Sequence, residues 1–276
     1  MKIMRFIGIV FALFSAGSPS DTSAQDSGKK YKVYMVSNSH LDTQWRWDVK
    51  ATIDDYLYNT AVQNLALLEK YPHYVFNFEG AVKYEWIKEY YPHLFERIRK
   101  FVADGRWNIS GASFEANDPN MPSSESFIRN ILLAQEFYKK EFGIKSKDMF
   151  LPDCFGFSQV MPTLGHHCGL IGFSTQKLSW RTEPLVGDSK TPFPIGLWEG
   201  VDGARIMVAL EPGRYSWNEF PEGDLSANEE LAESARKSPF GIAYRYYGNK
   251  LANGAGDHGG SALPRSIQLL EEGITN

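Results

Sequence analysis

The chain has 276 residues, of which 43% are hydrophobic and 14% aromatic, and it carries a formal net charge of −4. This is enough apolar material for one large hydrophobic core or two small ones. Because the charge is nearly balanced and no basic stripe occurs, we expect neither nucleic acid nor an anionic membrane surface as a partner.

The first 24 residues have the pattern of a signal peptide. Lys2 and Arg5 precede an apolar run that is shorter than the roughly 20 residues needed to cross a bilayer. Thr22-Ser23-Ala24 then supplies small residues for cleavage, and a polar leader follows at 25–30. A buried N-terminal helix is the alternative, which the charged and polar flanks disfavour. We therefore predict export to the periplasm or the extracellular space, and no membrane span elsewhere in the chain.

Strand-like apolar runs alternate with helical patterns from residue 31 to residue 176. In chain order, we predict a strand at 31–36, a helix opened by the capping box Thr52-x-x-Asp55, a strand at 74–80, a helix at 82–105 that Pro92 interrupts, a strand at 106–115, a helix at 123–142, and strands at 148–153 and 170–176. Such βα units favour a largely parallel sheet, which binds ligands beyond the C-terminal ends of its strands, whether it is open or closed into a barrel.

The pattern weakens after Trp180. Residues 197–210 are typical of a β-hairpin that turns at Asp202-Gly203. Residues 249–260 are glycine-rich, as in a site loop or a flexible linker, and a short helical pattern covers 263–274.

Polar residues follow three of the predicted strands. His40 and Asp42 come after the first, Glu115 and Asp118 after the third, and Asp153 after the fourth, so we expect them to face one crevice. An imidazole and two carboxylates from separate strand ends suit zinc or a similar ion in an open site. Locally, however, the first pair also fits a polar turn and Asp153 a helix N-cap. Glu115 and Asp118 could hydrogen-bond to the metal ligands, but their sequence is slightly more typical of residues that form a turn.

Three other features are open to two interpretations each. Asp257 lies between glycines that would let a backbone approach a ligand, but an ordinary surface turn has the same composition. Trp45 and Trp47 could stack on a sugar or pack in the core. Cys154 and Cys168 could pair in an oxidising compartment, although their spacing is not a CxxC motif and inert thiols are the default interpretation.

Taken together, these stretches resemble glycoside hydrolase family 38, the retaining zinc-dependent α-mannosidases. The resemblance spans roughly residues 31–266. It is carried, in chain order, by His40-Leu-Asp42-x-x-Trp45, Gly105-Arg-Trp107, Glu115-x-x-Asp118-x-Asn120-x-Pro122, Pro152-Asp153-x-Phe155-Gly156, Gln176-Lys177-Leu-Ser-Trp180 and Trp198-Glu-Gly-x-Asp-Gly203.

The resemblance implies that His40, Asp42 and Asp153 bind Zn²⁺, and that Asp153 is also the nucleophile that forms a covalent mannosyl-enzyme. It implies that Asp257 is the general acid/base, although Ser261-Ala262 stand where the family has Gly-Pro. Retention of configuration then places the carboxyl groups of Asp153 and Asp257 about 5–5.5 Å apart.

The resemblance further implies that Trp45 lies under the mannose and that Phe155 and Lys177 contact the substrate, an α-mannose-containing glycan. The implied fold is a seven-stranded β/α barrel of the glycoside hydrolase/deacetylase type, incomplete at the C-terminus, with residues 31–276 as the N-terminal part of the catalytic domain.

One departure concerns the metal. The family's fourth zinc ligand is a histidine in a downstream His-x-Gly setting, and the sequence ends at Asn276 without that motif. We therefore expect little activity from this chain alone. Two other interpretations stay open: a non-catalytic sugar- and zinc-binding remnant, and a metal-dependent deacetylase acting on polysaccharide.

Overall fold

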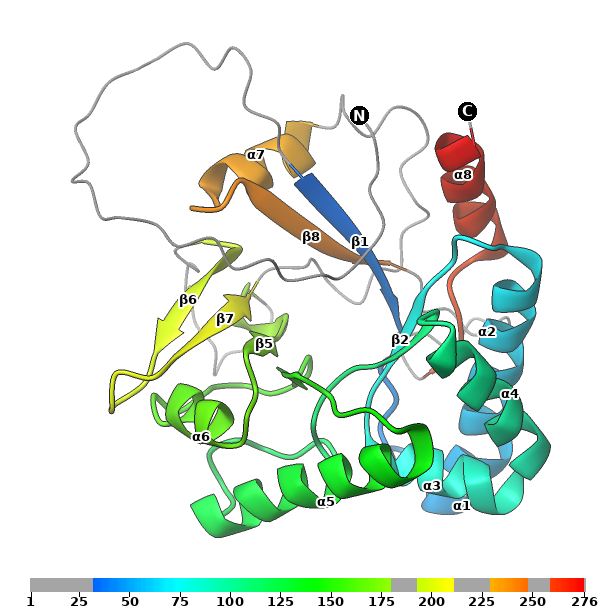
Figure 1. Ribbon diagram of the computed structural model, residues 1–276, viewed down its shortest axis with the longest axis horizontal. Coiled ribbons are helices and arrows are strands. Elements are labelled where there is room, and N and C mark those ends of the chain that lie inside the picture. The colour runs from blue at the N-terminus through cyan, green and yellow to red at the C-terminus, as the bar shows by residue number, and fades with distance from the viewer. Residues whose placement is uncertain (1–31, 180–192, 211–228, 248–258, 276) are drawn as a thin grey trace.

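The computed structural model describes residues 32–179, 193–210, 229–247 and 259–275 (Figure 1). The predicted signal peptide and the polar leader lie outside these residues. The described strands form two four-stranded sheets, in the orders β3-β2-β1-β8 and β4-β5-β7-β6. The strands are β1 Lys32–Asn38, β2 Phe76–Phe78, β3 Trp107–Ile109, β4 Asp148–Phe150, β5 Gly172–Ser174, β6 Ile195–Glu199, β7 Arg205–Ala209 and β8 Ile242–Tyr247.

Helices cover the outer faces of both sheets (Figure 1). They are α1 Val49–Ala51, the π-helix η1 Thr52–Leu57, α2 Tyr58–Lys70, α3 Ala81–Tyr90, α4 Pro92–Ala103, α5 Ser124–Phe142, α6 Met161–His167, the 3₁₀ turn η2 Lys177–Ser179, α7 Glu229–Lys237 and α8 Pro264–Thr275. Within the described residues, no helix combines the length and the apolar character that crossing a membrane requires.

The predicted parallel arrangement is confirmed. Strand β1 pairs in parallel with β2 and β8, β2 with β3, and β5 with β4 and β7. The exception is β6, which pairs with β7 as the antiparallel hairpin predicted at Asp202-Gly203. Gly203 has a φ of 81°, which glycine adopts without strain.

The predicted seven-stranded barrel, incomplete at the C-terminus, is not seen as such, because the described strands form two sheets of four strands each. Between β3 and β4, the backbone contact is a bond of 2.8 Å from the Ala112 N–H to the Asp148 carbonyl. The Asp148 carboxylate accepts from the Gly111 N–H at 3.2 Å, so a side chain satisfies a group that a ladder would otherwise pair. Opposite, the Tyr244 hydroxyl on β8 contacts Ser174 Oγ at 2.7 Å and donates to the Ala209 carbonyl at 3.0 Å.

Three apolar clusters fill the space between these layers. The largest joins β1–β3 to α2–α5 and contains Trp107, whose indole N–H donates to the buried Tyr84 hydroxyl at 2.9 Å. A second lies between β4, β5, β7 and the helices α5 and α6. A third, between the two sheets, consists of Phe150, Ile195 and Tyr244. The fold is therefore one in which sheet-to-sheet contact is made by a small apolar cluster and a few polar bridges.

Local signals predicted some boundaries well and others badly. Helix α5 begins after Ser123, whose hydroxyl accepts from the Ser126 N–H at 3.2 Å, and ends at Gly143 with a φ of 73°, as predicted. The predicted capping box at Thr52 is wrong. The helix starts three residues earlier, where the Asp48 carboxylate accepts from the Ala51 N–H at 2.8 Å.

Four elements were not predicted at all: α6, η2, α7 and β8. Helix α6 follows the Asp153 loop directly. Strand β8 lies beside β1 for six residue pairs, from Lys32–Ile242 to Ser37–Tyr247. This pairing joins residues some 200 positions apart in sequence, so the local sequence of 242–247 does not predict the pairing.

Candidate metal centre

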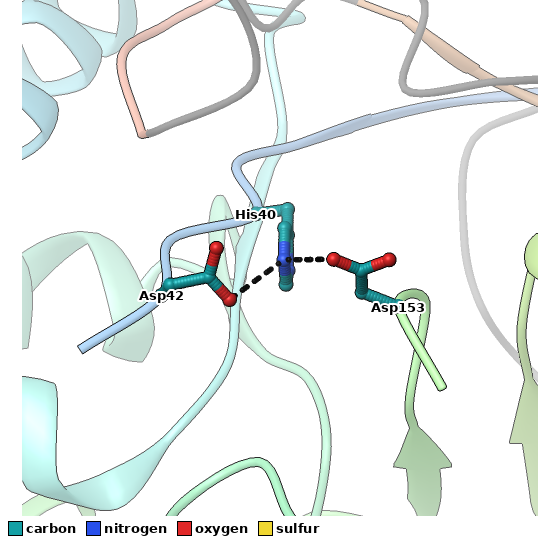
Figure 2. Close-up of side chains that lie close together, drawn as sticks. All are labelled: His40, Asp42 and Asp153. Carbon is teal, nitrogen blue, oxygen red and sulfur yellow. Dashed lines mark ion pairs between the residues drawn. The ribbon is translucent and has the colours of Figure 1, made fainter. Parts of the chain in front are cut away.

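Three side chains of ligand type meet where β1 and β4 end. His40 and Asp42 follow β1, and Asp153 follows β4; Figure 2 shows the imidazole between the two carboxylates. His40 Nε2 lies 3.2 Å from Asp42 Oδ1 and 3.4 Å from Asp153 Oδ2. The three potential ligand atoms all lie within 4.8 Å of one another. The side chain of His40 is 4% exposed and those of the aspartates about a third, so the group is buried on one side and accessible on the other.

The local sequence explains these positions. Leu41 is buried at 1% exposure between His40 and Asp42, and it anchors the turn that presents the two polar side chains. Asp153 follows the buried residues Phe150 and Leu151. The Gly259 N–H donates to the His40 carbonyl at 2.7 Å, so the chain returns to this point after residue 258.

The electrostatics of the group favour charged forms. Burial lowers the pKa of His40, but hydrogen bonds to Asp153 and Asp42 outweigh that effect and raise its pKa to about 9. Burial raises the pKa of each aspartate, and the interaction with His40 more than offsets this, so both values fall below the usual range. For Asp153, Lys177 adds to this lowering, because its Nζ lies 2.5 Å from Oδ1.

This donor set fits a divalent cation. One imidazole nitrogen and two carboxylate oxygens are ligands that zinc and similar ions accept, and three protein ligands leave positions for substrate or water. A divalent cation would balance the charges of the two carboxylates.

Two of the residues implied to contact substrate are exposed aromatic side chains. Trp45 is 55% exposed and Phe155 47% exposed. The Arg46 guanidinium lies 4.2 Å from the centre of the Trp45 ring, and Lys177 Nζ lies 5.1 Å from the centre of the Phe155 ring. Lys177 thus contacts both Phe155 and Asp153. Asp257 lies outside the described residues.

The remaining sequence candidates separate into distinct roles. Asp118 is a turn former, since its carboxylate accepts from the Asn120 and Met121 N–H groups at 2.7 and 3.0 Å. Glu115 is half-buried and hydrogen-bonds to Thr43, the residue after Asp42; burial raises its pKa. Glu115 therefore supports the Asp42 turn.

Both cysteines are free. Burial raises the pKa of the Cys154 thiol to about 12, and the thiol lies 3.5 Å from the Asn117 carbonyl. This agrees with the interpretation of Cys154 as an inert thiol.

Sequence reasoning missed two polar features beside the site. Glu79 directly follows β2 and forms a buried ion pair with Lys83. A Glu and a Lys four residues apart are typical of a solvated helix face, so this spacing does not indicate that the two side chains are buried. Gln176 is 1% exposed, and neither atom of its amide has a hydrogen-bond partner among the described residues. Its position directly after β5 was the available signal.

A separate apolar cavity of about 280 Å³ lies over β5, β6 and β7. Phe157, Phe173 and Trp198 are among the side chains that line it. It contains no carboxylate or imidazole, so it does not share the chemistry of the metal centre.

The sequence of this chain matches a known family and several curated relatives. The model of the glycosyl hydrolases family 38 N-terminal domain matches residues 30–270. Alpha-mannosidase G of Dictyostelium discoideum is 37% identical over 190 residues, which cover 69% of this chain and 17% of that protein. Mouse alpha-mannosidase 2C1 is 34% identical over 245 residues, covering 88% and 22%, and the Saccharomyces cerevisiae alpha-mannosidase is 31% identical over 240 residues, covering 86% and 21%.

Solved structures agree on the fold. An alpha-mannosidase from Enterococcus faecalis V583 superposes with a TM-score of 0.68 at 22% identity, covering 88% of this chain and 27% of that one. A 4-alpha-glucanotransferase from Thermococcus litoralis superposes with a TM-score of 0.56 at 14% identity, covering 79% and 33%. The chain spans about a fifth of the length of the curated relatives it matches. The match across residues 30–270, with relatives above 30% identity, shows that the chain belongs to glycosyl hydrolase family 38 and contains its N-terminal domain.

Proposed function

We propose that this chain carries the metal-binding and nucleophile part of a retaining, zinc-dependent α-mannosidase. The observation that carries the proposal is the convergence of His40, Asp42 and Asp153 from the ends of two strands in different sheets. The relatives above 30% identity are named alpha-mannosidases, which supports the choice of substrate, an α-mannose-containing glycan.

His40, Asp42 and Asp153 would hold the zinc ion. When bound, zinc would act as a Lewis acid and as a template for neighbouring hydroxyl groups of the mannose. The protein's own contribution is to keep His40 buried and fixed between the carboxylates.

Asp153 is the proposed nucleophile. The Lys177 ammonium, 2.5 Å from Asp153 Oδ1, favours the ionised form of this residue, in which the carboxylate would attack the anomeric carbon as the glycosidic C–O bond breaks. Asp257 would donate its proton to the departing oxygen, and would then take a proton from the water that cleaves the mannosyl ester. Gly259, two residues after Asp257, donates to the His40 carbonyl, which supports placing this segment at the site.

Trp45 and Phe155 would provide the apolar surface of the mannose subsite. Large exposed aromatics beside a polar group are the arrangement that binds the apolar face of a sugar ring while excluding water. Lys177, which touches both Phe155 and Asp153, would orient the nucleophile toward a sugar bound there.

Two further proposals concern the whole chain. The two sheets would be parts of one β/α barrel of seven parallel strands, with Ala112 and Tyr244 bridging the gaps and β6 as an added hairpin strand. Residues 1–24 would direct export, on the strength of their signal-peptide pattern.

Zinc titration of the metal-stripped chain by isothermal calorimetry tests the proposal. We expect one zinc ion per chain, with affinity reduced about 100-fold or more in His40→Ala and Asp153→Ala, because each removes a ligand. Asp54→Ala, at an exposed aspartate on η1, is the matched control and should bind as the wild type does. Absence of binding, or binding that neither ligand variant weakens, would overturn the proposal.

A further inference from the structure

Thr52 forms an unusual set of contacts for a residue inside a helix. Its side chain is fully buried, at 0% exposure, in the first position of η1. The hydroxyl accepts from the Trp47 indole N–H at 2.8 Å and lies 2.8 Å from the Thr43 carbonyl, to which it donates. One hydroxyl therefore joins both ends of the segment 43–47.

That segment contains Trp45, which is proposed above to lie at the mannose subsite. Asp42 precedes it, and Trp45 stands in its middle. Trp47 packs edge-to-face on Trp45, with ring centres 5.8 Å apart, and lies against Tyr56 of η1 at 4.6 Å. Fixing Trp47 and the Thr43 carbonyl therefore restricts the orientation of Trp45 and the position of Asp42.

The helix start does not require this hydroxyl. The Asp48 carboxylate caps the first turn through the Ala51 N–H, and the Thr52 N–H donates to the Asp48 carbonyl at 3.1 Å. The backbone donors at this end are thus satisfied without the Thr52 side chain. The hydroxyl makes its two shorter contacts, of 2.8 Å each, with the preceding loop, and a longer one of 3.3 Å with the Asp48 carbonyl.

We propose that Thr52 is a positioning residue for sugar binding, whose hydroxyl holds the loop 42–47 so that Trp45 faces the mannose subsite and Asp42 the metal. This inference rests on the proposed function. It adds a residue outside the metal and nucleophile groups, and it gives the π-helix a role in presenting that hydroxyl to the loop.

The test compares Thr52→Val, which keeps the shape and removes the hydroxyl, with Thr52→Ser, which keeps the hydroxyl. Thr163→Val is the matched control, because it removes a threonine hydroxyl that contacts Asp202 at the remote β6–β7 hairpin. The first readout is the Trp47 indole N–H resonance, assigned with Trp47→Phe. We expect about 10-fold faster hydrogen exchange of this group in Thr52→Val, and wild-type exchange in Thr52→Ser and Thr163→Val.

The second readout is the affinity for methyl α-mannoside in the presence of zinc, measured by calorimetry. We expect about 10-fold weaker sugar binding in Thr52→Val, recovered to within about twofold in Thr52→Ser. Equal sugar affinity in Thr52→Val and Thr52→Ser, with the wild type binding normally, would overturn the positioning role alone. A wild-type chain that binds neither zinc nor sugar would overturn the proposed function and this role with it. If Thr52→Val does not fold, Trp47→Phe removes the same hydrogen bond from the donor side and must show the same loss of sugar affinity.

Discussion

Replacing Lys83 by methionine should strongly lower the free energy of unfolding, although the shape of the side chain changes little. Its side chain is 0% exposed and forms an ion pair with Glu79, which is 3% exposed. In Lys83→Met, the apolar stem of the side chain is largely replaced, but Glu79 is left charged, buried and without its partner.

The expected cost follows from this burial. Removing one member of a buried pair destabilises a protein by about 3–5 kcal/mol, because the remaining charge is no longer compensated. Neither side chain is exposed enough for water to screen that charge. With a urea dependence of about 3 kcal/mol per molar for a chain of this size, the unfolding midpoint should fall by about 1–1.7 M.

Urea unfolding followed by circular dichroism checks this value. The double variant Glu79→Gln/Lys83→Met should recover most of the loss, because a buried ion pair and a neutral replacement are often nearly equal in stability. The control is Lys50→Met at the exposed pair with Asp54, which should leave the midpoint unchanged. A shift below about 0.3 M for Lys83→Met, or a double variant no better than the single one, would show that the pair does not act as a buried charge pair.

Three other predictions probe separate parts of the fold. Leu65→Ala, at a fully buried position on α2, should cost about 2–5 kcal/mol in urea unfolding, whereas Leu132→Ala, at 54% exposure, should cost little; equal losses would contradict the assigned core. Glu271→Gln should loosen α8, because the Glu271 carboxylate accepts from the His73 N–H and contacts its Nδ1, each at 2.6 Å; limited proteolysis should then cleave 264–275 faster, and an unchanged digest would count against this docking contact. Burial raises the pKa of Asp148, so its protonated form stabilises the fold at low pH, and this stability is lost as the pH rises from the unfolded value of about 3.8 through the higher folded value. Asp148→Asn lacks that loss, so its stability relative to the wild type should grow across this interval and then level off; a difference that stays constant with pH would refute the assignment.

Sequence patterns predicted the elements whose signals are local. Helix α5 lies where the helical pattern at 123–142 indicated, between a serine N-cap and a left-handed glycine. The Asp202-Gly203 turn defined the β6–β7 hairpin in the same way. The groups that form such a cap or turn are close together in the sequence, so the sequence alone is enough to predict where the element begins or ends.

Predictions failed where contacts outside the motif decide the outcome. Thr52 has the sequence of an N-cap, but the Asp48 carboxylate caps the helix, and the Thr52 hydroxyl bonds the Trp47 indole and the Thr43 carbonyl. Glu79 and Lys83 have the spacing of a surface pair, but their side chains are only 3% and 0% exposed. For this pair the local preference is worth about 1 kcal/mol or less, and burial is worth several times more.

The metal centre shows the same division within a single site. The ligand types at His40, Asp42 and Asp153 are visible in the sequence, because each follows an apolar run that ends in a turn. Their convergence on one crevice was expected from the ends of parallel strands, but their distances were not, because His40 and Asp42 follow a strand of the β1 sheet and Asp153 a strand of the β4 sheet. The contact of 3.4 Å between His40 and Asp153 therefore depends on how the sheets pack, through Phe150, Ile195 and Tyr244 between them and the Ala112 bridge beside Asp148. Residues that touch no ligand atom thus set the separation of the ligands, which is why the candidate ligands could be named from the chain while their geometry could come only from the folded structure.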